Sequence, residues 1–364
     1  MSTYPTKLME AFAARALKIF YARSITDAIT NQDYEGQVKN KSSKLNVLTF
    51  SKITSHNYTG ADMSVDSLTE SNSQLVTDQA KYFYFEIKDY DTFRSYIKSP
   101  DATILDQVAN ELRKVVDTHV LALNADVGAG NRDGTDYTTG TVTVTTGTGQ
   151  VDGDGTTFVT GMVGKGFKAT GHSSWYKVKS FASTVSMIIE DDSDDETSAY
   201  TGGAIGAGAT YTVQANTALT VTKDTIFARC NELGMVLTNS EIPMESRWLV
   251  VPARIANLVR QAPEYISAGT ESGRENVMNG ILSKKFCGFD LYEVSDDRIN
   301  GDNTDGYNCL GGHKSAITHA MGLTEQGIED LIGNFGKAYK SLYVYGSKVP
   351  DERRKALVEG FWKV

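Results

Sequence analysis

The chain has 364 residues, of which 40% are hydrophobic and 22% are charged, a composition that excludes wholesale disorder. This length exceeds what one compact core usually holds, so at least two packed units are expected. The net charge of -9 excludes a strongly basic nucleic-acid footprint, and no stretch holds the roughly 20 apolar residues that a membrane span needs.

The amino-terminal segment, residues 1–24, is predicted to form a cationic amphipathic helix. It has no uninterrupted apolar core of the kind that marks a signal peptide. We therefore expect the protein to be made and used inside a cell, or released when the cell breaks. Residues 1–52 carry eight Lys or Arg and four acids. This local excess of +4 favours either contact with a polyanion or acidic partner, or a solvated charged arm.

Residues 45–75 are polar with short alternating pieces, and they are predicted to form a two-stranded excursion with little core of its own. In the following segment, 81–88, Phe83, Phe85 and Ile87 alternate with tyrosine and charged residues. This period of two predicts a strand with one buried face.

Residues 104–123 place apolar side chains at helical spacing and predict a helix roughly 30 Å long. Asp101 is the expected N-cap of this helix. Its expected inner face carries Ile104, Val108, Leu112, Val115, His119 and Leu123. A long helix directly after an aromatic strand is a spine on which other parts can be built.

Residues 126–216 hold 16 of the 33 glycines, together with eleven acids and five Lys or Arg. Short β-type runs alternate there with glycine-rich turns: TVTVTT, TTFVTGMV, WYKVKSF, TVSMIIE and TYTVQA. This pattern predicts a small, acidic all-β domain, either a sandwich or a barrel, inserted into a larger parent fold of mixed α and β texture.

After residue 217 the chain returns to that mixed texture. A helix is expected over 223–237, a strand over 247–251, and a second helix that Pro252 opens. The remaining expectations are a strand pair in KKFCGFDLYEVS, a helix in LTEQGIEDLI near Thr324 and Gly327, and two strands in AYKSLYVYGSKV and KALVEGFWKV.

The search for chemistry gives no catalytic, cofactor-binding or metal-ligating residues. GMVGKG at 161–166 lacks the spacing of a phosphate-binding loop. The acidic run EDDSDDE at 190–196 lacks the glycine and distal glutamate of an EF-hand, so a solvated hairpin tip is favoured over a calcium site. Five dispersed histidines, His56, His119, His172, His313 and His319, match no catalytic signature. Three widely spaced cysteines, Cys230, Cys287 and Cys309, are expected to be reduced and mostly buried.

The order of the segments resembles the major capsid proteins of tailed bacteriophages, which share the Hong Kong 97 fold. The segments that carry this resemblance are ITNQDYEG, LVTDQAKYFYFEIKDYD, the long helix, IPMESRWLVVPARIANLV, FCGFDLYEVSD and LYVYGSKV. The resemblance covers the chain except residues 126–216, and it rests on order and spacing rather than on catalytic motifs. It implies an α+β fold of the Hong Kong 97 type with an inserted small all-β domain.

The resemblance also implies a domain plan and a function. The plan has an N-terminal arm (1–44), an extended loop (45–80), a peripheral domain with the spine helix (81–125), the inserted all-β domain (126–216), an axial domain (217–335) and C-terminal strands returning to the peripheral domain (336–364). The implied function is self-assembly into pentamers and hexamers of an icosahedral shell around double-stranded phage DNA, without enzymatic activity, cofactor, membrane or small-molecule substrate.

The implied partners are other copies of the chain, a scaffolding protein, a portal and weakly held DNA, with assembly in the host cytoplasm and residence in the virion. Because some shells of this family crosslink a Lys to an Asn, Lys52 is a candidate donor, although non-covalent assembly is favoured. The alternatives are an encapsulin-like compartment shell, a β-rich surface adhesin, and an enzyme with a substrate-binding β insertion.

Overall fold

The computed structural model describes residues 24–31, 33, 44–50, 57, 70–88, 100–192, 199–263, 285–330 and 336–364. The predicted amino-terminal helix, His56 and Lys52 lie outside these residues. The chain forms two compact units. The first consists of Met1–Asp27, Asn31–Asp117 and Thr318–Lys348, and the second of Ala28–Thr30, Thr118–Ile317 and Val349–Val364.

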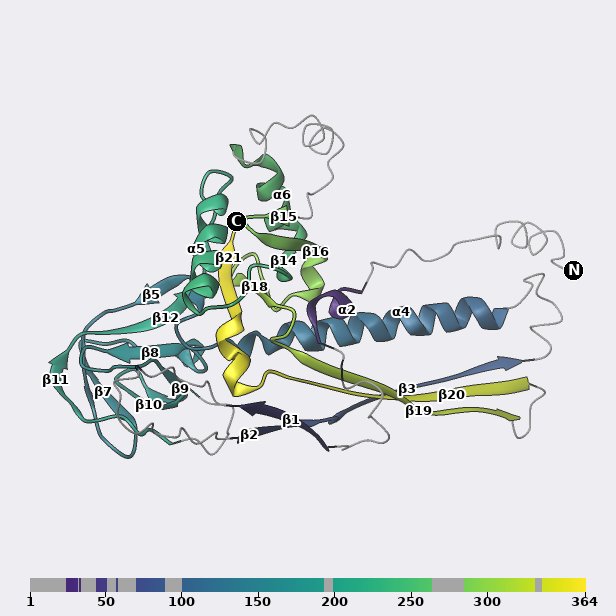
Figure 1. Cartoon of the computed structure of the whole chain (residues 1–364), viewed down its shortest axis with the longest axis horizontal. Coiled ribbons are helices and arrows are strands. Elements are labelled where there is room, and N and C mark those ends of the chain that lie inside the picture. The colour runs from purple at the N-terminus through teal and green to yellow at the C-terminus, as the bar shows by residue number, and fades with distance from the viewer. Residues whose placement is uncertain are drawn as a thin grey trace, which may run out of the picture. The chain divides into compact units, whose positions relative to one another are not determined.

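The first unit contains two antiparallel sheets (Figure 1). Strands β1 (Lys44–Phe50) and β2 (Glu70–Val76) pair along their full lengths, which confirms the predicted two-stranded excursion. A three-stranded sheet has the order β19 (Thr318–Asp330), β20 (Gly336–Lys348), β3 (Gln79–Lys88). Strand β3 confirms the strand predicted over 81–88 and forms one edge of this sheet.

The helix predicted in LTEQGIEDLI is wrong, because these residues lie largely in strand β19. Twelve residues of β19 pair with β20, with a bulge between Leu323 and Glu325. Gly322 and Gly327 each lower helix propensity by about 1 kcal/mol relative to alanine. The long partner strand β20 supplies backbone hydrogen bonds that the local periodicity did not reveal, so tertiary pairing decides the conformation.

Helix α4 (Pro100–Leu121) confirms the predicted spine helix but begins one residue before Asp101. Asp101 therefore lies in the first turn and is not the N-cap. The buried residues of α4, among those described, include Leu112, Val116, Asp117, Val120 and Leu121. Val115 and His119 of the predicted inner face are only half-buried. The short helices α2 (Thr26–Ile29) and η2 (Ala122–Asp126) lie before and after it in the sequence.

The second unit contains a sheet of eight short strands that we call the β module. Its strand order is β11-β6-β7-β10-β9-β8-β12-β5. Strands β11 and β12 lie far apart in this order, yet only Thr210 separates them in the sequence. The sheet must therefore roll around its own core, as Figure 1 shows. The strands are β5 (Thr135–Tyr137), β6 (Thr141–Val144), β7 (Gln150–Asp154), β8 (Gly166–Ala169), β9 (Tyr176–Ser183), β10 (Ser186–Asp191), β11 (Ile205–Ala209) and β12 (Tyr211–Thr217).

The interior of the β module confirms the predicted all-β character of this segment. Its core includes Val142, Val151, Phe158, Phe167, Val178, Met187, Ile189, Tyr211 and Val213. The strand predicted in TTFVTGMV is wrong, because this stretch forms a loop with the 3-10 turn η3 (Thr160–Met162). Phe158 and Met162 of this loop are both fully buried, so the loop closes the core instead of extending the sheet.

The second sheet of this unit, the core sheet, is flanked by two helices. Helices α5 (Ile226–Asn239) and α6 (Ala253–Gln261) confirm the two predictions made for them. The order of the core sheet is β13 (Leu219–Thr220), β21 (Leu357–Lys363), β18 (Gly306–His313), β14 (Arg247–Pro252), β16 (Phe289–Val294) and β15 (Lys285–Phe286). Strand β17 (Gly301–Asp302) pairs with β18, β4 (Arg132–Asp133) pairs with β21, and the 3-10 turns are η4 (Asp296–Arg298) and η5 (Asp351–Ala356).

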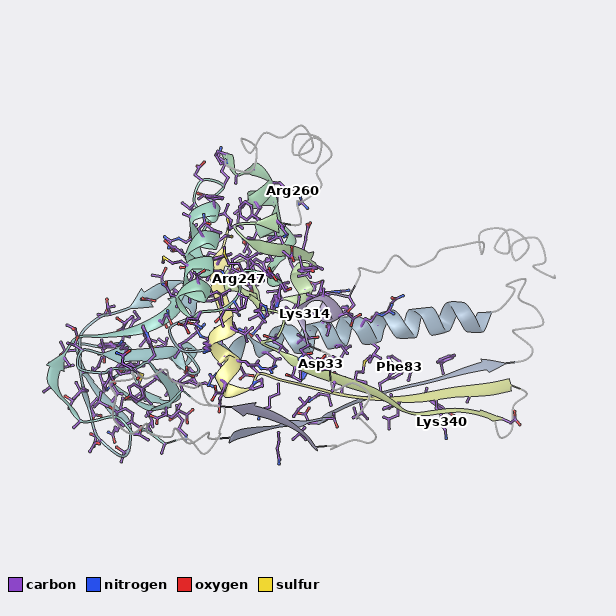
Figure 2. The ribbon with its side chains drawn as sticks, in the orientation of Figure 1. Asp33, Phe83, Arg247, Arg260, Lys314 and Lys340 are labelled. Carbon is purple, nitrogen blue, oxygen red and sulfur yellow. The ribbon has the colours of Figure 1, made fainter. Side chains whose placement is uncertain are left out.

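The buried side chain of Arg247 binds helix α5 and the turn that follows it (Figure 2). Its guanidinium donates to the carbonyl oxygens of Gly234 at 3.1 Å, Pro243 at 2.8 Å and Ile242 at 2.5 Å. Gly234 lies within α5, whereas Ile242 and Pro243 follow its last residue, so the guanidinium joins the helix to the turn after it and complements the helix dipole. This contact fixes the turn between α5 and β14.

The predicted strand pair in 336–364 is divided between the two units. Strand β20 pairs with β3 in the first unit, while β21 pairs with β18 in the second. The first unit also takes in β19, so the division between units falls at Ile317, before the end of the predicted 217–335 segment.

Candidate functional site

Within the described ranges, no three or more His, Cys, Asp or Glu side chains gather as a metal site would require. No helix in these ranges combines the length and apolar character needed to cross a membrane. Cys230 and Cys309 are buried and Cys287 is half-buried, which confirms that these thiols are mostly buried, while their reduced state stays a prediction. Burial raises the pKa of Cys309 well above its ordinary value, so this thiol is protonated and unreactive.

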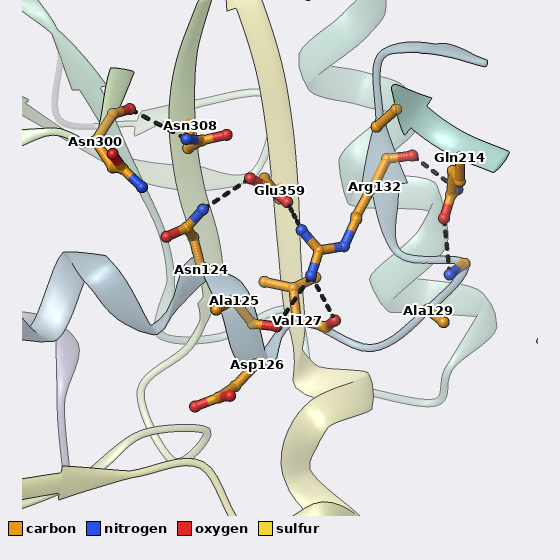
Figure 3. A network of polar contacts seen from close by, with 12 residues as sticks. Asn124, Ala125, Asp126, Val127, Ala129, Arg132, Gln214, Asn300, Asn308 and Glu359 are labelled. Atoms are coloured by element: carbon orange, nitrogen blue, oxygen red, sulfur yellow. Dashed lines mark hydrogen bonds and ion pairs between the residues drawn. The ribbon is translucent and has the colours of Figure 1, made fainter. Parts of the chain in front are cut away.

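The second unit contains a buried polar junction between the β module and the C-terminal strand β21 (Figure 3). Arg132 on β4 donates from its guanidinium to the carboxylate of Glu359 on β21. Their side chains are only 3% and 0% exposed. The Glu359 carboxylate also accepts a hydrogen bond from the Asn124 side chain at 3.0 Å. Two charges so fully removed from water need this degree of satisfaction, because an unpaired buried charge is strongly destabilising.

Further hydrogen bonds hold the Arg132 end of the junction in place (Figure 3). The same guanidinium donates to the carbonyl oxygens of Ala125 at 3.2 Å and Val127 at 3.1 Å. The Gln214 side chain donates to the Arg132 carbonyl at 2.8 Å and accepts from the Gly130 backbone at 2.8 Å. The entry and exit of the β module therefore meet at one point, because Gly130 precedes its first strand and Gln214 lies in β12.

A second group of contacts links strand β21 to β4, to helix α5 and to the β module. The Trp362 indole donates to Asp133 at 2.7 Å, and Asp133 also forms an ion pair with Arg229 of α5 at 3.6 Å. Desolvation raises the pKa of Asp133 despite these two partners, which lower it. The Lys165 ammonium lies 4.6 Å from the centre of the Phe361 ring. Burial lowers the pKa of Lys165, while nearby Glu359 opposes that effect.

The acidic run predicted as a solvated tip has at least one structural role. Asp192 forms an ion pair with the Arg354 guanidinium at 2.7 Å and accepts a hydrogen bond from the Ala129 backbone at 2.6 Å. Arg354 also donates to the Asp126 carbonyl at 2.9 Å. Residues 193–198 lie outside the described ranges, so the rest of the predicted tip stays a prediction.

The first unit contains a buried carboxylate that anchors the beginning of the described chain. Asp117 on α4 is fully buried. Its Oδ1 accepts hydrogen bonds from the hydroxyl groups of Ser24 at 2.8 Å and Thr26 at 2.7 Å. It also accepts from the backbone amides of Ile25 and Thr26, at 3.3 and 3.2 Å. These contacts fix Ser24, Ile25 and Thr26 on helix α4.

Strand β3 exposes aromatic side chains at a sheet edge. Tyr82 and Tyr84 are 76% and 58% exposed, and β20 is the only strand that pairs with β3 in the described sheet. On the opposite face Phe83 (Figure 2) is only half-buried and packs edge-on against Tyr343 at 6.1 Å. The predicted buried face is therefore incompletely covered. A free strand edge with exposed rings is a surface suited to pairing with another chain.

His172, His313 and His319 serve as hydrogen-bonding groups within their units. The Nδ1 atom of His313 lies 2.8 Å from the Ser315 hydroxyl, and that of His319 lies 2.8 Å from the Ser347 hydroxyl. His172 is buried in the β module and binds Tyr200. The glycines of GMVGKG lie around the turn η3, which agrees with the rejection of a phosphate-binding loop.

Sequence reasoning missed the residues of the junction and the anchor. Arg132 and Glu359 are 227 residues apart, so no local spacing could link them. Asp117 lies between Val115 and His119 of the expected apolar face, and no local pattern marks it as buried. The only local sign at the junction is that Glu359 interrupts the apolar run Leu357, Val358, Phe361, Trp362.

No protein-family model and no curated protein matches the chain. Solved structures that are similar over most of its length include the following three. A chain of Mycobacterium phage Che8 has 17% identity and a TM-score of 0.56, with 94% of this chain and 93% of that chain covered. A chain from the capsid of the cyanophage P-SCSP1u has 13% identity and a TM-score of 0.55, with 96% and 91% covered. A chain from the mature capsid of bacteriophage PhiM1 has 10% identity and a TM-score of 0.52, with 94% and 88% covered. The chain therefore has the fold of these phage capsid chains.

Proposed function

We propose that this chain is the major capsid protein of a tailed bacteriophage. Copies assemble into pentamers and hexamers that form an icosahedral shell around double-stranded DNA. The observation that carries this proposal is the similarity in fold to capsid chains over 96% and 94% of the protein. A similarity of this extent includes the whole architecture rather than one common motif.

The proposed architecture follows the Hong Kong 97 plan. The N-terminal arm is 1–44 and the extended loop 45–80. The peripheral domain is built from 81–125 and the paired strands β19 and β20. Residues 126–216 are the inserted all-β domain, and most of 217–335 together with β21 forms the axial domain. The pairing of β3 with β20, and of β21 with β18, supports this assignment of the last two strands.

Two features of the first unit support contact with further copies of the chain. A three-stranded sheet with exposed Tyr82 and Tyr84 leaves apolar surface in water that another subunit can cover. The ribbon β1–β2 pairs only with itself among the described strands. Two strands alone are marginally stable in water, so docking of this ribbon on a neighbour is expected to contribute to its stability.

The remaining partners follow from the proposed role. A scaffolding protein and a portal take part in assembly in the host cytoplasm, and the finished protein resides in the virion. The net charge of -9 supports only weak, non-specific contact with DNA, concentrated at the basic residues of 1–52. The role requires no enzymatic activity and no cofactor.

Expression of the full chain, alone and with its neighbouring genes, tests the proposal through light scattering and electron microscopy. Closed shells or capsomer rings are expected. A monodisperse monomer of 39.7 kDa under all conditions would contradict the proposal. Shells purified from infected cells should contain packaged DNA, whereas DNA-free shells loaded with a protein cargo would favour the encapsulin-like alternative.

A further inference from the structure

His172 occupies the turn between β8 and β9 and lies in a group of aromatic rings inside the β module. Its ring centroid lies 4.6 Å from that of Tyr176, 5.8 Å from that of Tyr200 and 6.1 Å from that of Phe167. The residue is 9% exposed. A polar ring in such surroundings must find partners for both of its nitrogen atoms.

The hydrogen bonds assign a role to each nitrogen. The Tyr200 hydroxyl donates to the Gly203 carbonyl at 2.6 Å, so its oxygen is left to accept. The His172 Nε2 lies 2.8 Å from that oxygen and therefore carries the donated hydrogen. The Nδ1 atom accepts the backbone N–H of Ala169 at 3.3 Å. This arrangement holds the neutral imidazole with its hydrogen on Nε2, because Nδ1 faces a donor.

The same contacts close the turn. The His172 backbone N–H donates to the Ala169 carbonyl at 3.0 Å, while the Ala169 N–H donates to the His172 ring. Gly171 within this turn has a φ of +106°, which favours glycine. The neighbouring Thr170 N–H donates to the Thr210 carbonyl at 2.8 Å, between β11 and β12. The turn is therefore tied to the link between β11 and β12.

We propose that His172 is an acid-sensitive latch of the β module: protonation at Nδ1 breaks its bond to Ala169, opens the β8–β9 turn and frees the segment around Tyr200. The imidazolium has a donor on each nitrogen, so its new N–H points at the Ala169 N–H. The ring must then turn away or the backbone must move. Either movement breaks the contact between His172 and Tyr200, which holds residues 199–203 to the module.

The charges around the ring oppose protonation. Lys168 on β8 adds a positive charge, and after burial it is the second cause that lowers the pKa of His172 below its ordinary 6.5. The neighbouring phenols of Tyr176 and Tyr200 are neutral, since burial raises the pKa of both. Asp191 on β10 is the nearby acid, and it accepts hydrogen bonds from the Thr201 hydroxyl at 2.6 Å and backbone at 3.0 Å.

The direction of the effect follows from linkage. The folded module binds a proton on His172 more weakly than the unfolded chain, whose histidine titrates near 6.5. The stabilisation by neutral His172 is therefore fully present above pH 6.5 and is lost as the pH falls through the folded-state pKa. Between these two pKa values the equilibrium constant for opening of the β module rises by up to about tenfold for each unit by which the pH falls.

Hydrogen–deuterium exchange of the full chain at pH 7.5 and pH 5, corrected for intrinsic exchange rates, tests the latch. Protection in peptides covering 166–172 and 199–204 is expected to fall severalfold at pH 5 relative to the core sheet. H172Q keeps one donor and one acceptor but does not titrate, and should remove this acid response. Its matched control is H313Q, because His313 also accepts a backbone N–H, from Ser315 at 3.2 Å, and lies outside the module.

An unchanged acid response in H172Q, or pH-independent protection in the wild-type chain, would overturn the proposal. Should H172Q fold poorly, imidazole NMR of the wild-type chain provides a separate decision. The latch requires an Nε2–H tautomer at pH 7.5 and a titration midpoint below 6.5 that coincides with a shift of the Ala169 amide. An Nδ1–H tautomer, or a midpoint above 6.5, would contradict it. Neither readout depends on shell formation, so the latch and the capsid proposal succeed or fail separately.

Discussion

The guanidinium of Arg132 binds the carboxylate of Glu359, and this buried ion pair joins the first strand after the spine helix to the last strand of the chain. Strands β4 and β21 pair in parallel at these same two residues. The segment that leads into the β module is therefore part of the core sheet. The pairing of β4 with β21 can form only after the C-terminal residues have been synthesised.

Replacing one partner of this ion pair should lower the stability of the second unit more than replacing both partners. R132M leaves Glu359 buried without its cation, and we expect the second unit to lose about 3–5 kcal/mol of stability. R132M/E359M should recover much of that loss, because neither charge remains buried. Urea unfolding followed by tryptophan fluorescence measures both, since all three tryptophans, Trp175, Trp248 and Trp362, belong to the second unit.

The control for this pair is R254M, which removes the exposed Arg254–Asp296 pair in the same unit. An exposed pair contributes at most about 1 kcal/mol. Equal destabilisation by R132M and R254M would show that the junction is not energetically distinct.

Loss of the Asp117 carboxylate should release the segment around Ser24 and Thr26. D117N keeps the size of the side chain but weakens the hydrogen bonds from two hydroxyls and two amides, with an expected loss of about 2–3 kcal/mol locally. Limited proteolysis should then cut within 20–30 faster than in wild type. Glu111 is exposed on the same helix, so E111Q should leave the cleavage rate unchanged. Equal rates in D117N and wild type would exclude an anchoring role.

Two glycines of the β module make a matched test of packing. Gly147 and Gly149 both have positive φ, of +77° and +64°. A Cβ at Gly147 meets no atom within 4 Å, whereas one at Gly149 collides with the Ile189 carbonyl. G147A should therefore lose only about 1 kcal/mol from backbone strain. G149A should lose clearly more, with a lower unfolding temperature in calorimetry. The same effect from both would show that the rolled sheet is not packed as described.

The exposed rings of β3 should matter for assembly and not for the isolated subunit. Y82S/Y84S removes side chains that contribute little to the folded subunit, so its unfolding temperature should stay within about 2 °C of wild type. The yield of assembled particles in sedimentation should fall severalfold, because buried apolar contact between copies is lost. V185S, which changes an exposed residue of the β module, is the control for a general solubility effect. Normal particle yield from Y82S/Y84S would remove β3 from the subunit interface.

Local patterns predicted the elements whose stability is local. Each of these signals lies within a few residues of the element it predicts. They are the amphipathic spacing of α5, Pro252 before α6 and the aromatic alternation of β3. The glycine-rich turns and short β-type runs of 126–216 predict its all-β character for the same reason. The sequence leaves open whether this segment forms a sandwich or a barrel, and it does not give the strand order, because that order depends on pairings between residues far apart.

The errors arise where a distant partner decides the outcome. Strand β19 has a helix-like spacing around Ile328, yet β20 pairs with it over twelve residues. The run containing Phe158 has the composition of a strand. It forms a loop instead, because Phe158 and Met162 are both buried in the core of the β module. No local pattern marks Asp117 or Glu359 as buried, and both are buried by partners elsewhere in the chain.

Electron cryomicroscopy of particles formed by the full chain tests the capsid proposal most directly. The proposal predicts closed icosahedral shells whose reconstruction contains this chain in both hexamers and pentamers, with β3 facing a neighbouring copy. Monomers alone, or particles in which the chain occupies no lattice position, would contradict it.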